Sequence, residues 1–309
     1  MNRTVIVCAL AAGASATGAS PQFFTSITKP LFGNNDPDIF FADVQTGAST
    51  FLLNPEAEPA ISASAPGFTG LAADEPGSRL FAITTNGTRS GLYSLDYATL
   101  TPTFLSNITR PASTDGLVLD GLAYDSSRSV LYATRRLGGT TGTEGLYSIN
   151  PATGESTVLL EYESGTFNIE ISAIDYDPVT DMVYLVDEDA DAGRGIYSFN
   201  PVDPGAGLSL LASLPSDITD VDGLGAGDGQ LFLLSDGPDA NGGFHRVFDL
   251  TTMTFDIASI PTPYPEYSDS VLGPINPSGG GAYAPGIPGP ATALLALPAT
   301  ALLARRRRN

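Results

Sequence analysis

The chain has 309 residues, of which 42% are hydrophobic and 16% charged, so it is long enough to bury a sizeable core. It also contains 34 Gly and 24 Pro, which indicates many turns. The formal net charge is −20, and five of the 14 basic residues lie at the ends: Arg3, Arg305, Arg306, Arg307 and Arg308. The rest of the chain has nine basic residues against 34 acidic ones, and a body this acidic repels phosphate, which argues against a nucleic-acid partner.

The first 20 residues are typical of a secretory signal peptide. Arg3 provides a positive start, and Val5 to Ala12 form an apolar segment that is too short to span a bilayer. Small residues follow at Ala14 and Ala16, so we expect cleavage between about residue 16 and residue 20. Cys8, the single cysteine, lies inside this segment, so the exported chain is predicted to have neither disulfides nor thiol chemistry.

The body of the chain, residues 21–284, is repetitive. Similar segments begin at Gly70, Gly121 and Ala173, and a looser copy begins at Gly223, so that successive starts lie 51, 52 and 50 residues apart. Each unit contains four short alternating or apolar runs separated by turn residues, such as "DGLAYD", "VLYATR", "GLYSIN" and "STVLLEY" in the second unit. Four antiparallel strands in a repeat of this length are typical of a β-propeller blade.

The ends of the body match half units. The segment 38–53 matches the second half of a unit, and the segment 270–285 matches the first half. We therefore predict an all-β, five-bladed β-propeller that is closed by strands from both termini, since closure pairs strand edges that would otherwise be exposed. Six blades are the alternative, if "QFFTSITKPLF" from Gln22 to Phe32 pairs in another way.

Acidic residues supply the candidate metal sites. Asp187, Asp189 and Asp191 alternate in "DEDADAG", which is a pattern of oxygen ligands suited to calcium, although Gly193 comes one place late for a calcium loop and no closing glutamate follows. Asp120 and Asp222 precede the expected inner strands, and their carboxylates could approach one another in the central channel. The alternative for both sets is that they are solvated or begin turns.

No catalytic residues are predicted. The single histidine, His245, lies on an expected strand without a recognisable nucleophile, so we interpret it as structural. The fold resembles that of calcium-dependent lactonases and phosphotriesterases of the gluconolactonase-like propeller class, which implies a metal in the channel, but their motifs have no residue-by-residue match here. A hydrolase of that kind is the alternative function.

The last 25 residues, 285–309, contain a proline pair, an apolar segment from Ala291 to Ala304 and an arginine cluster. Together with a signal peptide, this layout resembles the PEP-CTERM sorting signal, which implies recognition by an exosortase, a membrane protease-transpeptidase. The Pro-Glu-Pro of that signal corresponds here to Pro288, Gly289 and Pro290, so glycine replaces the glutamate. The resemblance implies a C-terminal hydrophobic sorting helix, with Arg305 to Arg308 remaining on the cytoplasmic side. A simple C-terminal membrane anchor is the alternative.

These features predict an exported protein of the cell surface or extracellular matrix, membrane-anchored for a time through its C-terminal segment. The expected function is binding or structural rather than enzymatic, with a polysaccharide or a surface protein as the partner.

Overall fold

The computed structural model describes residues 22–27, 38–43, 49–53, 68–85, 90–96, 102–110, 117, 119–135, 144–162, 171–188, 193–218, 221–235, 243–256, 260–262 and 281–284. The predicted signal peptide and sorting segment lie outside this part. The described residues are strands and turns with one short 3-10 helix, η2 (Pro204–Ala206). None of the helices described is long and apolar enough to cross a membrane.

The described strands form five antiparallel sheets, each built from strands that follow one another along the chain or close the ring. Sheet I is β4 (Phe68–Asp74), β5 (Arg79–Thr85), β6 (Ser90–Asp96) and β7 (Pro102–Asn107). Sheet II is β8 (Leu122–Asp125), β9 (Val130–Arg135), β10 (Glu144–Ile149) and β11 (Ser156–Tyr162). Sheet III is β12 (Ile171–Asp177), β13 (Met182–Asp187), β14 (Gly195–Phe199) and β15 (Leu208–Ser213). Sheet IV is β16 (Val221–Gly227), β17 (Gln230–Ser235), β18 (Gly243–Asp249) and β19 (Thr254–Phe255), and β20 (Ile260–Thr262) also pairs with β18.

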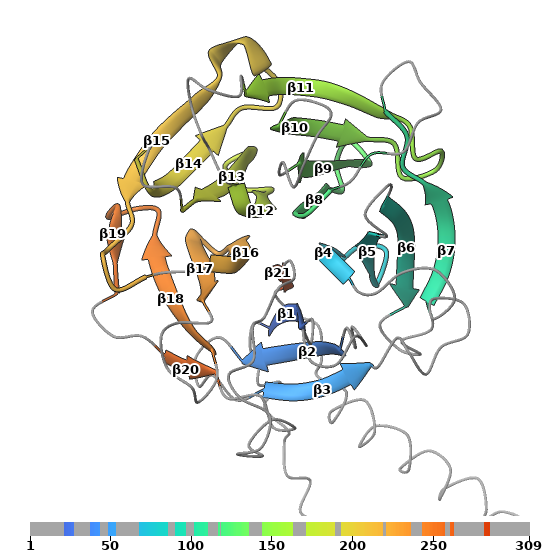
Figure 1. Cartoon of the computed structure of the whole chain (residues 1–309). Coiled ribbons are helices and arrows are strands. Elements are labelled where there is room, and N and C mark those ends of the chain that lie inside the picture. Colours follow the sequence, from blue (N-terminus) through green and yellow to red (C-terminus); the bar gives the residue numbers. More distant parts are fainter. Residues whose placement is uncertain are drawn as a thin grey trace, which may run out of the picture.

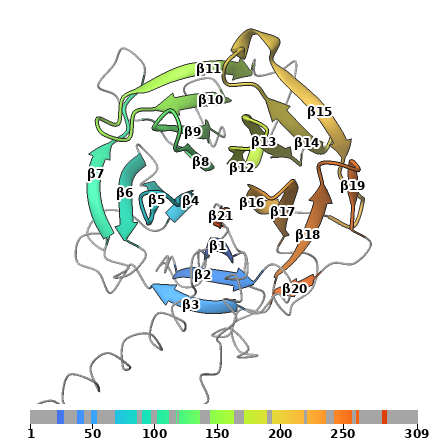
Figure 2. The ribbon, with the colours of Figure 1, turned by 180° about the vertical axis from the view of Figure 1, so that it is seen from behind.

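The remaining sheet joins the two ends of the body. In this closing sheet, β21 (Gly281–Ala284) pairs with β1 (Gln22–Ile27), which continues to β2 (Asp38–Asp43) and β3 (Ser49–Leu53). β1, the described part of the segment Gln22–Phe32, thus lies between β21 and β2. Figures 1 and 2 show the five sheets arranged around an axis, with β4, β8, β12, β16 and β21 innermost. The all-β propeller architecture predicted from the repeats is confirmed.

A recurring bulge shows that the sheets are copies of one unit. In sheets I, II and III the register between the third and fourth strands shifts just before the tyrosine of "GLYS" or "GIYS": Tyr93, Tyr147 and Tyr197. The closing sheet has the same shift before Phe40. Because bulges add twist at a fixed point, the repeats share the strand geometry as well as the hydrophobic pattern.

The core lies between neighbouring sheets. One cluster joins sheets I and II through side chains such as Phe81, Leu122 and Tyr147, and two further clusters join sheet II to III and sheet III to IV. Sheets II and III are therefore covered on both faces by their neighbours, which explains the apolar runs of their strands.

Glycine at the start of the inner strands permits this packing near the axis. A Cβ on Gly121 would lie 2.5 Å from Ile174 Cγ2 of sheet III and 2.7 Å from Thr134 Oγ1. A Cβ on Gly70 would lie 2.8 Å from the carbonyl oxygen of Asp120. Glycine is therefore required at both positions, because a Cβ would clash with atoms of the same or the neighbouring sheet.

Candidate functional site at the channel mouth

The inner strands of sheets I to IV run into tight hairpin turns at one end of the channel, which we call the mouth. We call the opposite end, where the second and third strands of each sheet are joined, the loop end. Asp74, Asp125 and Asp177 close the inner strands of sheets I, II and III, and all three are buried.

These three carboxylates organise the turns that follow them. Asp125 Oδ1 accepts hydrogen bonds from the backbone N–H groups of Ser127 and Arg128, at 2.9 and 3.0 Å. Asp177 accepts from the N–H groups of Val179 and Thr180 in the same way. Aspartate suits such turns because its short side chain reaches the backbone two or three residues on.

Sheet IV departs from this pattern. The position of the turn aspartate is Gly227, and the strands are joined by Asp228 and Gly229 alone, with φ of 53° and 75°. Two positive φ angles in a two-residue loop are the signature of a type I′ hairpin, for which Asp-Gly is a preferred pair. Asp228 consequently lies at the tip of its turn, rather than at the buried end of the strand.

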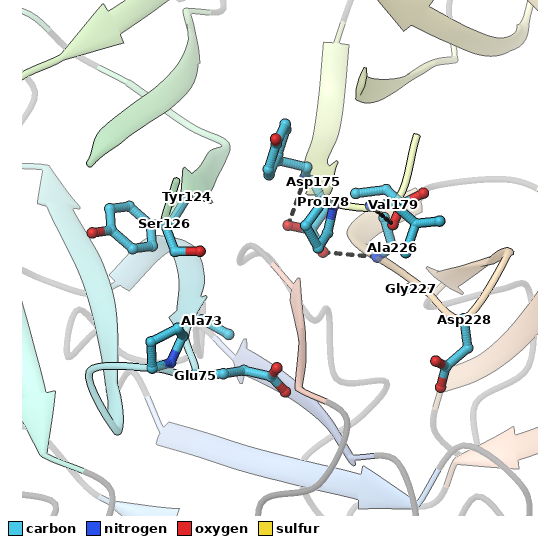
Figure 3. A pocket seen from close by; sticks show the side chains of 13 residues that line it. Ala73, Glu75, Tyr124, Ser126, Asp175, Pro178, Val179, Ala226, Gly227 and Asp228 are labelled. Carbon is cyan, nitrogen blue, oxygen red and sulfur yellow. Dashed lines mark hydrogen bonds between the residues drawn. The ribbon is translucent and has the colours of Figure 1, made fainter. Parts of the chain in front are cut away.

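A pocket of about 120 Å³ lies among these turns. Its lining includes polar and apolar side chains of all four sheets: Ala73, Glu75, Pro76, Tyr124, Ser126, Asp175, Tyr176, Asp177, Pro178, Val179, Ala226, Gly227 and Asp228. Figure 3 shows Glu75 extending from sheet I, Tyr124 and Ser126 from sheet II, Asp175 and Pro178 from sheet III, and Asp228 from sheet IV. Residues from four sheets therefore meet at one place on the axis.

Glu75 is the unusual group of the pocket. Its Oε1 atom is shielded from solvent, and no hydrogen-bond partner among the described residues reaches it. Burial, followed by the negative charge of Asp228, raises the pKa of Glu75 to about 7. Near neutral pH this carboxyl group can therefore either accept or donate a hydrogen bond.

Asp175 lines the pocket but has a structural task. Its Oδ2 accepts a hydrogen bond of 2.7 Å from the backbone N–H of Ala226, and its Oδ1 accepts one of 2.8 Å from the N–H of Tyr176. The first bond crosses from β12 to β16 and is drawn as a dashed line in Figure 3. Asp175 thus fixes the distance between the inner strands of sheets III and IV.

Arg128 joins the turns of sheets II and III. Its guanidinium donates to both carboxylate oxygens of Asp181, each at 2.6 Å, and also to Asp125 Oδ2 at 2.5 Å. Tyr176 donates its hydroxyl to Asp181 Oδ1 at 2.8 Å. The hydrogen bonds from Arg128 and Tyr176 lower the pKa of Asp181 to about 2. Only Tyr176 of these residues lines the pocket, so the hydrogen bonds form a connected network beside it, which we call the rim network.

The channel residues predicted from the sequence, Asp120 and Asp222, lie at the loop end rather than at the mouth. Asp120 precedes β8 at the loop end, where its N–H bonds to the carbonyl of Thr134. Asp222 lies within β16, at a bulge equivalent to that at Thr69 in β4, so the expectation that it precedes the strand is wrong. Asp120 is not among the described residues that line the mouth pocket.

The predicted calcium loop connects β13 to β14 at the loop end. Asp187, the last residue of β13, is fully buried, whereas Asp189 and Asp191 lie outside the described residues. Within the described part of the chain, no group of three His, Cys, Asp or Glu side chains is placed to hold a metal ion. The carboxylate cluster that a channel metal would need is thus not formed by those residues. His245 is buried on β18 opposite Leu234. The sorting residues Pro288, Gly289, Pro290 and Arg305 to Arg308 also lie outside the described part.

Sequence reasoning missed Glu75 as a site residue. The repeat does contain a signal for the turns, since Asp74, Asp125 and Asp177 recur at nearly constant spacing. Nothing in that spacing distinguishes Glu75, because its burial depends on turns contributed by other sheets.

The fold and the ring of inner turns define a protein of the β-propeller class. The chain is similar in structure to a chain of the crystal structure of a nidogen/laminin complex, with a TM-score of 0.50 and 12% sequence identity over 85% of this chain and 98% of that one. It also matches TolB from Acinetobacter baumannii, with a TM-score of 0.48 and 13% identity over 78% of this chain and 53% of that one. No protein-family model and no curated protein matches the sequence. At these identities the first likeness supports the fold alone.

Proposed function

We propose that this chain is an exported cell-surface or extracellular-matrix protein that binds a ligand, rather than transforming it, at the mouth of its propeller channel. The observation that carries the proposal is the pocket shared by four sheets, with the solvent-shielded Glu75 Oε1 in its wall. A concave site with a few convergent polar groups is the usual place for a small ligand.

The chemistry of the lining favours a polysaccharide as the ligand. Glu75 and Asp228 offer acceptors for hydroxyl groups, while Tyr124, Pro76 and Pro178 add apolar surface for the faces of a sugar ring. Two further acidic side chains of the pocket have structural roles, since Asp177 accepts hydrogen bonds from the turn that follows it and Asp175 bridges two sheets. The volume suits one sugar unit of a longer chain.

We further propose that the five sheets make up the whole ring, as five blades. The support is the direct pairing of β21 with β1 and the bulge that the closing sheet shares with sheets I, II and III. The N-terminal signal peptide would export the chain. The segment 285–309 would anchor it in the membrane until an exosortase-type enzyme processes it, and Pro288, Gly289 and Pro290 would take the place of the sorting motif.

A carbohydrate array with two charge-neutralising variants tests the binding proposal. Immobilised neutral, amino-sugar and uronic-acid polysaccharides would be probed with the wild-type chain, with Glu75→Gln and with Asp203→Asn. Asp203 is an exposed residue of an outer turn, and its side chain makes no capping hydrogen bond. Asp203→Asn is therefore the control, because it removes the same charge as Glu75→Gln at a position away from the pocket.

We expect one polysaccharide class to retain the wild type and Asp203→Asn. Glu75→Gln should bind it about tenfold more weakly, since a hydrogen bond to a charged group contributes about 1.5–3 kcal/mol. Equal retention of all three chains would show that Glu75 does not contribute to binding. Retention of none would contradict the polysaccharide assignment.

A further inference from the structure

Both ends of the described chain leave the propeller at the mouth. Gln22, the first residue of β1, pairs with Ala284, the last residue of β21. β21 is the innermost strand of the closing sheet, as β4, β8, β12 and β16 are in theirs, and each of those four strands ends at the mouth. The repeat unit gives β21 the same direction, so Ala284 lies at the same end of the channel as Glu75 and Asp228.

The segment that follows Ala284 is short. Seven residue steps separate Ala284 from Ala291, where the apolar segment begins. A fully extended chain of that length spans at most about 25 Å. If residues 291–304 are embedded in a membrane, the mouth therefore lies within about 25 Å of the lipid surface.

The ring is too large for the short tether to bring the loop end to the membrane. A domain of this length has a radius of gyration of about 18 Å, which corresponds to a diameter of roughly 45 Å. An inner strand of seven residues is about 23 Å long. To bring the loop end to the membrane, the tether would have to pass from the axis to the rim and then along the side, a path of about 45 Å. A tether of this length cannot do so.

We propose that, while the C-terminal segment is held in a membrane, the mouth of the channel faces that membrane and the loop end faces away from it. This inference rests on the C-terminal anchor of the proposed function. It adds that a ligand reaches the pocket from the membrane side, so the ligand would be a polysaccharide emerging from the same surface. Because the acidic body repels anionic lipid, a hydrated gap remains beneath the ring. Removal of the tail would release the mouth to bulk solvent.

A full-length chain with one reporter cysteine at either end of the channel tests the orientation. Cys8 is the only cysteine of the chain, so a Cys8→Ala background allows unique labelling. Ser126→Cys places a donor fluorophore at the mouth, and Ser216→Cys, three residues beyond the end of β15, places one at the loop end. Both serines are exposed. The chains would be reconstituted with vesicles of phosphatidylethanolamine and phosphatidylglycerol that carry an acceptor-labelled lipid.

Both labelled chains should float with the vesicles, with energy transfer to the lipid about twofold greater from position 126 than from position 216, since a strand length separates the two labels. A chain with Leu294→Asp and Leu295→Asp is the control that should no longer float. Flotation with equal transfer, or with greater transfer from position 216, would overturn the orientation and leave the anchor intact. Failure of the unaltered tail to float, or flotation of the Leu294→Asp/Leu295→Asp chain, would overturn the anchor, and the orientation with it.

Discussion

The carboxylate of Asp175 accepts a hydrogen bond from the backbone N–H of Ala226, 51 residues further along the chain. This bond connects the inner strands of sheets III and IV at the point where both line the mouth pocket. The shape of the candidate site therefore depends on a bond between blades, rather than on either blade alone.

Replacing Asp175 by Ala should destabilise the propeller. The N–H groups of Ala226 and Tyr176 would lose their buried acceptor, which costs about 1–3 kcal/mol for an unsatisfied group. Asp175→Asn keeps one acceptor oxygen and should lose less. Urea unfolding followed by circular dichroism measures both variants. If the two are as stable as the wild type, the bond between the blades is not a stabilising one.

Loss of Arg128 should destabilise the fold more than loss of Asp181, because Arg128 takes part in both ion pairs of the rim network. Arg128→Gln removes the ion-pair partner of Asp181 and also that of the buried Asp125, whereas Asp181→Asn leaves the ion pair of Arg128 with Asp125 in place. An unpaired buried carboxylate is costly, so thermal unfolding should occur at a lower temperature in Arg128→Gln than in Asp181→Asn. The reverse order of melting temperatures would mean that the exposed pair dominates.

The same network predicts a loss of stability in acid. The pKa of Asp181 is lowered to about 2, so its pairing stabilises the fold fully above its ordinary pKa of 3.8 and less as the pH falls towards 2. Asp181→Asn should therefore flatten the acid limb of the plot of melting temperature against pH. A plot parallel to that of the wild type between pH 4 and pH 2 would contradict this.

Glu75 should make the fold less stable as the pH rises, which is the opposite of the effect of Asp181. Its pKa is raised from 4.5 to about 7, so the folded chain holds a proton that the unfolded chain has released over this range. Its contribution to stability is greatest below the unfolded pKa and is lost as the pH rises through about 7. Glu75→Gln should remove this decline, whereas Asp203→Asn should keep it. Calorimetric melting temperatures at a series of pH values test the difference, and identical slopes for wild type and Glu75→Gln would refute the raised pKa.

Replacing Gly121 by Ala should destabilise the fold, because the space beside this glycine is too small for a Cβ. An added Cβ would meet Ile174 and Thr134 at 2.5 and 2.7 Å, so Gly121→Ala should cost about 1–3 kcal/mol through overpacking. Gly205→Ala is a matched control, because its nearest neighbour would be an oxygen of Asp203 at 3.6 Å. Chemical denaturation of both variants provides the comparison. A neutral Gly121→Ala would show that the sheets can separate at the axis at no cost.

The architecture could be predicted from the sequence because it is a local pattern repeated. Four short runs per unit, turn residues at fixed places and half units at the ends define blades and their closure before any contact is known. The inner glycine recurs in sheets I, II and IV and the tyrosine of "GLYS" or "GIYS" in sheets I, II and III, because these strands pack in the same way.

The pocket could not be predicted in the same way. Glu75 occupies a turn position where sheets II, III and IV have Ser126, Pro178 and Asp228, so the repeat does not indicate which of these residues is buried. Its raised pKa arises from burial and from Asp228, which lies 153 residues away in the sequence. The sequence predicts that Asp120 and Asp222 precede inner strands, but Asp222 lies within β16, and the strand direction places both residues at the loop end.

The central claim is that the mouth of the channel binds a polysaccharide, and isothermal titration calorimetry tests it most directly. The polysaccharide class retained on the array, cut to short oligosaccharides, would be titrated into the wild type, the double variant Glu75→Gln/Asp228→Asn and the control Asp203→Asn. We predict binding to the wild type and the control, and a loss of affinity of at least about tenfold in the double variant. Unchanged affinity in the double variant would contradict the claim that the channel mouth is the binding site.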